Sequence, residues 1–223
     1  MLPRSRPIWL FDLDNTLHDA SHAIFGSIDQ RMTDYVERVL GIDRTEANRL
    51  RTLYWRRYGA TLLGMVRHHG VDPHEFLRAC HDFNVAGLLR AEYGLARLFA
   101  RLPGRRVLLT NAPRTYAGCV LRELALHRQI TSRYTIERMR VHGTFRPKPS
   151  RLMLRAILAR ERVRPSTAIL VEDSLANLKA ARALGLRTVL ITRHGPSTER
   201  RRGTGVVGLR IRSLHELARR TPR

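Results

Sequence analysis

Four short and almost uninterrupted apolar runs constrain the fold of this chain more than any other feature of its sequence. They cover residues 8–11, 107–109, 168–171 and 188–191. Runs of this length and character are typical of parallel strands that are buried on both faces. Helical patterns lie between the later runs, over residues 115–126, 150–160 and 175–184, and Gly185 is placed to end the last of them. This alternation predicts an α/β fold with a doubly wound parallel sheet.

The long stretch between the first two runs predicts helices only. From residue 21 to residue 100 the apolar side chains recur at helical spacing. Gly41 is placed to end one helix, and Asp72 followed by Pro73 is placed to begin another. We therefore expect an all-helical insertion directly after the first strand.

This pattern divides the chain into two expected domains. They are an α/β core made of residues 1–17 and 101–223, and a helical cap domain made of residues 18–100. Open α/β sheets bind ligands at the carboxyl ends of their strands, so the insertion is expected to cap the site. Near the end of the chain we expect a loop over residues 198–208 and a short helix over 214–219.

The formal net charge of +22 would suit a nucleic-acid binder. Of the 41 basic side chains only Lys148 and Lys179 are lysines, which leaves 39 arginines. The arginines are scattered, with short clusters such as residues 200–202 and few aromatic residues between them. This skew is typical of codon bias in a GC-rich genome. We therefore expect a basic surface that attracts small anionic substrates rather than a nucleic-acid groove.

The apolar runs also bear on where the protein resides. None of them approaches the roughly 20 residues that a membrane-spanning helix requires. Residues 8–11 are too few to be the core of a secretory signal. We therefore predict a cytoplasmic protein with no membrane partner, in which Cys80 and Cys119 are free thiols.

The strongest chemical signal is the sequence Asp12-Leu13-Asp14-Asn15-Thr16, which follows the first apolar run. Two carboxylates spaced in this way at a strand end share one anionic site, which is costly without a cation. The pair therefore indicates a divalent metal such as Mg²⁺. A plain turn is the alternative, since Asp and Asn are common in turns, but a turn does not require this order of residues.

Three further signals lie later in the chain. Thr110 and Asn111 could hold phosphate oxygens through a hydroxyl and a backbone amide. Lys148 stands between two prolines in a chain saturated with arginine, which indicates that this position requires a compact ammonium group. Glu172 and Asp173 could complete a magnesium site.

The last of these signals has a second interpretation. Asp173 or Ser174 precedes a predicted helix, so either could serve as its N-cap. Both interpretations hold together if Ser174 caps the helix and Asp173 binds the metal.

In this order, the four motifs resemble the haloacid dehalogenase superfamily. The matching residues are Asp12-Leu13-Asp14-Asn15-Thr16, Thr110-Asn111, Lys148 and Glu172-Asp173. The helical insertion resembles the first cap type of that superfamily, found in its subfamily I. Residues 58–65, 69–73 and 81–83 look most like its pyrimidine 5′-nucleotidase branch. That branch often has a Tyr where this chain has His18.

The resemblance implies a Rossmann-like core and a magnesium-dependent phosphomonoester hydrolase with an aspartyl-phosphate intermediate. Asp12 would be the nucleophile and Asp14 the general acid and base. Lys148 would neutralise the charge of the nucleophile and of the transferring phosphoryl group. The small phosphorylated substrate would be a nucleoside 5′-monophosphate, and a pyrimidine one in particular. Its phosphate would be bound by Thr16, Thr110, Asn111 and Lys148.

The resemblance also implies how the chain holds Mg²⁺. The ligands would be a carboxylate oxygen of Asp12, the backbone carbonyl of Asp14 and Asp173. Glu172 would reach the metal through water or through one of its ligands.

Several alternatives stay open at this point. The motifs are expected to contact only the phosphate group of the substrate. The substrate could therefore instead be phosphoglycolate or a sugar phosphate. A dehalogenase or a mutase fits the motifs less well. A basic nucleic-acid-binding protein on the same fold is the alternative from another class. The oligomeric state is open.

Overall fold

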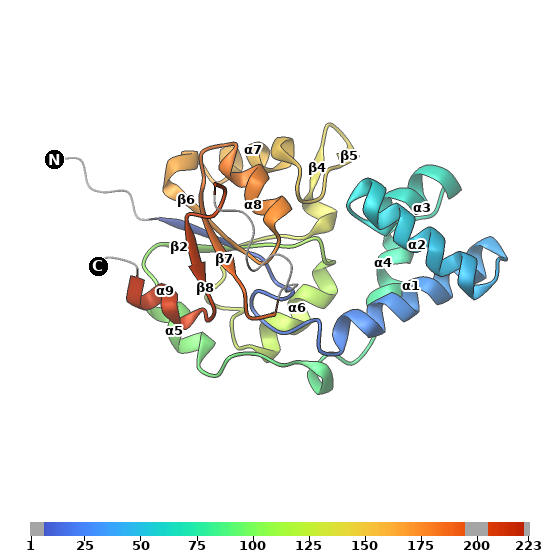
Figure 1. Cartoon of the computed structure of the whole chain (residues 1–223), viewed down its shortest axis with the longest axis horizontal. Helices are drawn as coiled ribbons and strands as arrows, with labels where there is room; N and C mark the ends of the chain where they lie inside the picture. Colours follow the sequence, from blue (N-terminus) through green and yellow to red (C-terminus); the bar gives the residue numbers. More distant parts are fainter. Residues whose placement is uncertain (1–6, 195–204, 221–223) are drawn as a thin grey trace. The chain divides into compact units, whose positions relative to one another are not determined.

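The fold was obtained as a computed structural model that describes residues 7–194 and 205–220. Within these residues six parallel strands form one sheet in the order β3-β2-β1-β6-β7-β8 (Figure 1). The strands are β1 (Ile8–Phe11), β2 (Arg105–Leu109), β3 (Ser132–Tyr134), β6 (Ala168–Glu172), β7 (Arg187–Ile191) and β8 (Leu209–Ile211). A separate antiparallel pair is formed by β4 (Arg140–Val141) and β5 (Thr144–Phe145). The predicted doubly wound parallel sheet is confirmed.

The chain reverses its direction across the sheet between β1 and β6. From β1 it proceeds outward to β2 and β3, and it then returns to β6 and proceeds the other way to β7 and β8. Strand β1 therefore lies between β2 and β6, with Phe11 aligned to Leu108 on one side and Val171 on the other. This is the switch point at which open α/β sheets bind their ligands.

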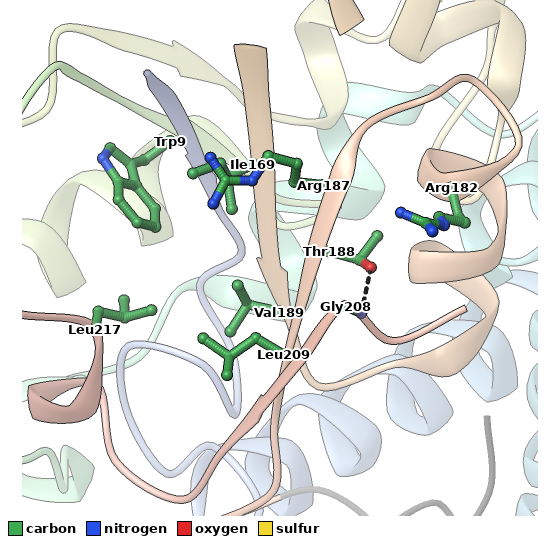
Figure 2. Close-up of a pocket in the computed structure, with 9 residues that line it drawn as sticks. All are labelled: Trp9, Ile169, Arg182, Arg187, Thr188, Val189, Gly208, Leu209 and Leu217. Carbon is green, nitrogen blue, oxygen red and sulfur yellow. Dashed lines mark hydrogen bonds between the residues drawn. The ribbon is translucent and has the colours of Figure 1, made fainter. Parts of the chain in front are cut away.

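Two strands of the sheet, β3 and β8, were not predicted. Both are three residues long and lie at the edges, and β3 carries Ser132 and Arg133, so neither has a continuous apolar run. Thr188 attaches the segment just before β8 to the sheet, because its hydroxyl donates to the Val206 carbonyl at 2.7 Å. The same hydroxyl accepts from the Gly208 N–H at 2.9 Å (Figure 2). Of the loop predicted over 198–208, residues 198–204 lie outside the described residues.

Helices cover both faces of the sheet (Figure 1). Side chains that alternate along a strand point to opposite faces. On one face Ile8, Leu10 and Leu170 pack with α7 (Arg151–Arg160) and α8 (Leu175–Arg182). On the other face Phe11 meets Phe99 of α5, with ring centroids 4.6 Å apart. The helices on that face are α5 (Leu95–Arg101), α6 (Arg114–Glu123) and α9 (His215–Arg220).

The face that carries Trp9 also contains a hollow of about 230 Å³ (Figure 2). Trp9, Ile169, Val189 and Leu209 line it from four strands, and Arg187 adds a guanidinium group. None of the residues that line the hollow is acidic, and none belongs to the motifs above. The hollow is therefore not the site that the sequence motifs predict.

Residues Ser21–Leu88 form a compact unit of their own, and the rest of the described chain forms the sheet unit. The smaller unit consists of helices α1 (Ile24–Leu40), α2 (Arg44–Tyr58), α3 (Thr61–His69) and α4 (Pro73–His81), followed by one 3₁₀ turn (Ala86–Leu88). The helical prediction for this stretch is confirmed. The expected cap of residues 18–100 is longer than this unit at both ends. At the C-terminal end the difference arises because α5 contacts α9 and groups with the sheet unit.

Local sequence signals explain where these helices begin and end. Asp43 and Asp72 each accept a backbone N–H three residues further on and so cap α2 and α4. Gly41 and Gly59 end α1 and α2 in the left-handed conformation, at φ of 64° and 80°. The predicted roles of Gly41 and of Asp72 with Pro73 are confirmed.

A pair of glycines in the helical unit tests how tightly α2 packs against α3. A Cβ on Gly64 would lie 2.1 Å from the Tyr54 Cγ, whereas a Cβ on Gly26 of α1 would meet nothing within 4 Å. We expect Gly64→Ala to lower the free energy of unfolding by about 1–3 kcal/mol, because the helices must separate. Gly26→Ala, the matched control, should raise it by about 0.5 kcal/mol. Urea unfolding followed by circular dichroism measures both. Equal effects would show that the packing adapts without cost.

Both cysteines are free, as predicted. Cys80 is buried in α4, and this burial raises the pKa of its thiol to about 12. Among the described residues, no helix combines the length and the apolar character that crossing a bilayer requires.

Candidate active site

A tight turn follows β1 and carries the first motif. The Asp12 N–H donates to the Val171 carbonyl at 3.1 Å, which continues the pairing of β1 with β6 by one residue. The Leu17 N–H then returns to the Leu13 carbonyl at 2.8 Å. Asn15 has a φ of 59°, a left-handed conformation that Asn tolerates better than most residues. The motif is therefore itself a turn. A turn at this place does not conflict with a chemical role for its carboxylates.

Three carboxylates gather where β1 and β6 end. They belong to Asp12, which follows β1, to Glu172, the last residue of β6, and to Asp173, the next residue. One oxygen from each lies within 4.8 Å of the others, a grouping that could hold a metal ion. Asp12 and Glu172 are buried, and Asp173 is half-buried.

Lys148 supplies the positive charge that this acidic cluster requires. Its Nζ lies 2.5 Å from Asp12 Oδ1 and 2.8 Å from Glu172 Oε2, and its side chain is 5% exposed. Lys148 comes from the segment between β5 and α7, far from both partners in the sequence. A compact ammonium group between two carboxylates agrees with the preference predicted for this position.

The electrostatics of the cluster follow from burial and from the number of charges. Burial and the charge of Glu172 raise the pKa of Asp12 well above its usual value, although Lys148 opposes them. Burial and Glu172 likewise raise the pKa of Asp173 to about 8. Burial would also raise the pKa of Glu172, but the Lys148 ammonium lowers it overall. Three carboxylates are thus too many for one ammonium.

Asn111 and Thr110, at the end of β2, both make hydrogen bonds within the chain. The Asn111 Oδ1 accepts the Lys148 N–H at 2.8 Å, and its Nδ2 donates to the Lys148 carbonyl at 3.2 Å. Asn111 therefore holds the backbone of Lys148, a role that the sequence did not indicate. The Thr110 hydroxyl accepts the Ala112 N–H at 3.0 Å.

Asp14 lies in a different environment from Asp12. Its Oδ1 is 2.6 Å from the Tyr116 hydroxyl, which donates to it, and 2.9 Å from His18 Nε2. Burial and Asp14 raise the pKa of Tyr116 far above its usual value. His18 was noticeable in the sequence because the resembling branch often has a Tyr at this position, whereas nothing in the sequence indicated Tyr116.

Two smaller predictions concern hydroxyl groups. The Thr16 hydroxyl is buried and has no hydrogen-bond partner among the described residues. Ser174 stands at the N-cap position of α8, but its side chain makes no capping hydrogen bond. Ser174 therefore holds the predicted N-cap position but lacks the side-chain hydrogen bond by which serine usually caps a helix. The Ser174 N–H instead donates to Glu172 Oε1 at 3.3 Å, which orients the carboxylate.

The residues of the cluster fit a divalent cation. Mg²⁺ prefers carboxylate and carbonyl oxygens, and it binds through one or two carboxylates while keeping several waters. The acidic cluster offers carboxylates of Asp12, Glu172 and Asp173. Burial, together with the charge of Glu172, raises the pKa values of Asp12 and Asp173, and the three acidic groups carry negative charge in excess of the single ammonium. A cation there would offset that excess.

Comparison with known protein families decides which class of protein carries this site. The model of the haloacid dehalogenase-like hydrolases matches residues 8–185. The chain belongs to the haloacid dehalogenase-like hydrolase family. The match includes the acidic cluster, Lys148 and the helical unit, so it covers all the motifs described above. The resemblance to this superfamily is confirmed, and the protein is a hydrolase.

Two known proteins are similar in sequence to this hydrolase. Phosphate metabolism protein 8 of Saccharomyces cerevisiae is 31% identical over 68 residues, which make up 30% of this chain and 21% of that protein. The chain thus matches only about a fifth of that relative's length. Phosphoglycolate phosphatase 1 of Pseudomonas aeruginosa is 26% identical over 206 residues, covering 86% of this chain and 70% of the relative.

Solved structures share the fold of this hydrolase. A HAD phosphatase from Thermococcus onnurineus superimposes with a TM-score of 0.65 at 22% identity, covering 96% of each chain. CbbY from Rhodobacter sphaeroides, a mutant in complex with xylulose-(1,5)bisphosphate, gives a TM-score of 0.64 at 21% identity and covers 95% of this chain and 96% of its own. At these identities the likeness shows the fold alone.

Proposed function

We propose that this hydrolase cleaves phosphate monoesters through an aspartyl-phosphate intermediate on Asp12. The observation that carries the proposal is the pairing of Asp12 with Lys148 inside a buried acidic cluster at the switch point of the sheet. A buried carboxylate held by an ammonium group suits attack on a phosphoryl group, whose negative charge the ammonium also neutralises.

In the first step the Asp12 carboxylate attacks phosphorus, and the bond from phosphorus to the leaving oxygen breaks. Asp14 in its acid form gives a proton to that oxygen, so an alcohol departs. Lys148 offsets the charge of Asp12 and of the phosphoryl group during the transfer. The product is a mixed anhydride between Asp12 and phosphate.

In the second step water attacks the phosphorus of the anhydride, and the bond from phosphorus to the Asp12 oxygen breaks. Asp14, now ionised, takes the proton from this water. Inorganic phosphate leaves, and both aspartates return to their starting forms. Water and one phosphate monoester are consumed, and one alcohol and one phosphate are released.

Magnesium and the phosphate-binding groups complete the proposed site. We propose that Asp12, Asp173 and the backbone carbonyl of Asp14 hold Mg²⁺, with Glu172 as an adjacent carboxylate. When bound, the ion neutralises the anionic groups and polarises the phosphoryl oxygens. The phosphate would be bound by Thr16, whose buried hydroxyl is available, by Thr110 and by Lys148. Asn111 would contribute by holding the backbone of Lys148.

The leaving group is the part of the substrate that the core motifs do not specify. Residues 58–65, 69–73 and 81–83 resemble pyrimidine 5′-nucleotidases, which supports a nucleoside monophosphate. The relative named phosphoglycolate phosphatase aligns over 206 residues, which supports a smaller anionic ester at least as well. CbbY, with its bound sugar bisphosphate, supports a sugar phosphate. We therefore propose two candidate substrate classes, small anionic phosphoesters and pyrimidine nucleotides.

A substrate panel with and without metal tests the reaction and the specificity together. We expect release of phosphate from UMP, CMP, phosphoglycolate or a sugar phosphate in the presence of Mg²⁺. A chelator should reduce the rate by roughly a hundredfold or more, and added Mg²⁺ should restore it, because the acidic cluster would then lack its cation. AMP serves as the control for base preference. Hydrolysis that is unchanged by the chelator would contradict the magnesium site, and no hydrolysis of any ester would contradict the proposed reaction.

A further inference from the structure

The carboxyl group of Asp14 is held by two side chains that the proposed reaction does not use. The Tyr116 hydroxyl donates to Asp14 Oδ1 at 2.6 Å, and His18 Nε2 lies 2.9 Å from the same oxygen. Both side chains are buried, each about 1% exposed. They also lie within reach of each other, with 3.5 Å between the Tyr116 hydroxyl and His18 Nε2.

The two side chains reach Asp14 from independent parts of the sheet unit. His18 lies four residues after Asp14, and the turn that follows β1 brings its ring back to the carboxylate. Tyr116 lies on α6, which follows β2, and is 102 residues away in the sequence. Because β1 and β2 are neighbours, α6 begins close to the end of β1. Two separate elements therefore fix the same oxygen.

The geometry distinguishes the two oxygens of the carboxyl group. A carboxylic acid carries its proton on one oxygen, and the other oxygen then only accepts. Oδ1 accepts from Tyr116, and it also accepts from His18 when the imidazole carries its proton on Nε2. A proton of the acid form on Oδ2 keeps both of these contacts. A general acid is effective only if its proton faces the atom that receives it.

We propose that His18 and Tyr116 are positioning residues that hold Asp14 Oδ1, so that the transferable proton is carried on Oδ2. This inference rests on the proposed function, in which Asp14 protonates the leaving oxygen. The competing explanation is that the two donors only satisfy a buried carboxylate and stabilise the fold. The two explanations differ in how the loss of a donor depends on the leaving group.

The test compares two phosphate esters in the Tyr116→Phe variant. An alkyl ester such as glycerol phosphate requires a proton on its leaving oxygen, whereas p-nitrophenyl phosphate releases a stable phenolate without one. We expect kcat/KM for the alkyl ester to fall roughly 10- to 100-fold, because a misplaced acid loses much of its effect. For p-nitrophenyl phosphate we expect a change within about threefold. Tyr93→Phe, at a side chain that is 98% exposed, is the matched control.

A second pair of variants tests the donor on the turn. His18→Gln keeps an N–H that can reach Asp14, and His18→Leu removes it. The Leu variant should show the same dependence on the leaving group as Tyr116→Phe, and the Gln variant should recover most of the alkyl esterase activity. Thermal unfolding of each variant separates loss of structure from loss of positioning. These variants also serve if Tyr116→Phe does not fold.

The outcomes separate this inference from the proposed function. Suppose that the unmodified protein hydrolyses both esters. If the variants then lose both rates equally, or lose neither rate, the positioning role is wrong and the proposed function stands. If the unmodified protein with Mg²⁺ hydrolyses neither ester, the proposed function fails and this inference fails with it.

Discussion

Replacing Asp12 by asparagine is expected to reduce turnover of any phosphate ester by roughly 10⁴-fold or more, because the amide is a poor nucleophile. The amide has almost the same shape as the carboxylate, so the loss reports chemistry rather than packing. Rates of phosphate release under saturating Mg²⁺ measure it. A substrate labelled with ³²P gives a second measurement, since the unmodified protein should yield an acid-stable phosphoprotein after quenching and the variant should not.

The same substitution should leave the fold intact or stabilise it. Burial and Glu172 raise the pKa of Asp12, so the ionised carboxylate is disfavoured in the folded protein. A neutral amide removes that charge, while Lys148 keeps its contact with Glu172 at 2.8 Å. We expect the midpoint of urea unfolding, measured without metal, to stay equal or to rise.

Asp34→Asn makes the same chemical change on the exposed surface of α1, where the carboxylate is 51% exposed, and it should leave activity unchanged. Substantial magnesium-dependent turnover by Asp12→Asn would show that another group is the nucleophile.

Replacing Lys148 by methionine is expected to reduce both activity and stability, in contrast to Asp12→Asn. The ammonium group pairs with two buried carboxylates, at 2.5 Å and 2.8 Å. Removing it leaves buried negative charge without a partner, which costs about 3–5 kcal/mol in the free energy of unfolding. Loss of a preorganised positive group at the transferring phosphoryl should also lower kcat by roughly 10²- to 10³-fold.

The chain contains its own control for this experiment. Lys179 is the other lysine, and it is exposed on α8. Lys179→Met should change the free energy of unfolding by no more than about 0.5 kcal/mol and leave kcat unchanged. Urea unfolding without Mg²⁺ gives the stability of both variants. If the two lysine variants were equally stable, the pairing of Lys148 with the carboxylates would not contribute to the fold.

The strands and the helical unit could be predicted from the sequence to different degrees. The four apolar runs predicted β1, β2, β6 and β7, because a strand buried on both faces must be continuously apolar. The edge strands β3 and β8 have no such run, since they need pair on one side only. The end of the helical unit was predicted too late in the chain for another reason, because α5 also has a helical pattern. Its contacts with α9 and with Phe11 of β1 assign it to the sheet unit.

The sequence alone determined that carboxylates and a threonine follow the strands of a parallel sheet, and that an isolated lysine stands between two prolines. That pattern is local, because each of these side chains lies next to the apolar run or proline pair that identifies it. Only the tertiary structure decided which of them meet. Lys148 reaches Asp12 across 136 residues, and Tyr116 reaches Asp14 across 102. These contacts depend on the order of the strands, which brings β1 between β2 and β6, and no periodicity in the sequence encodes that order.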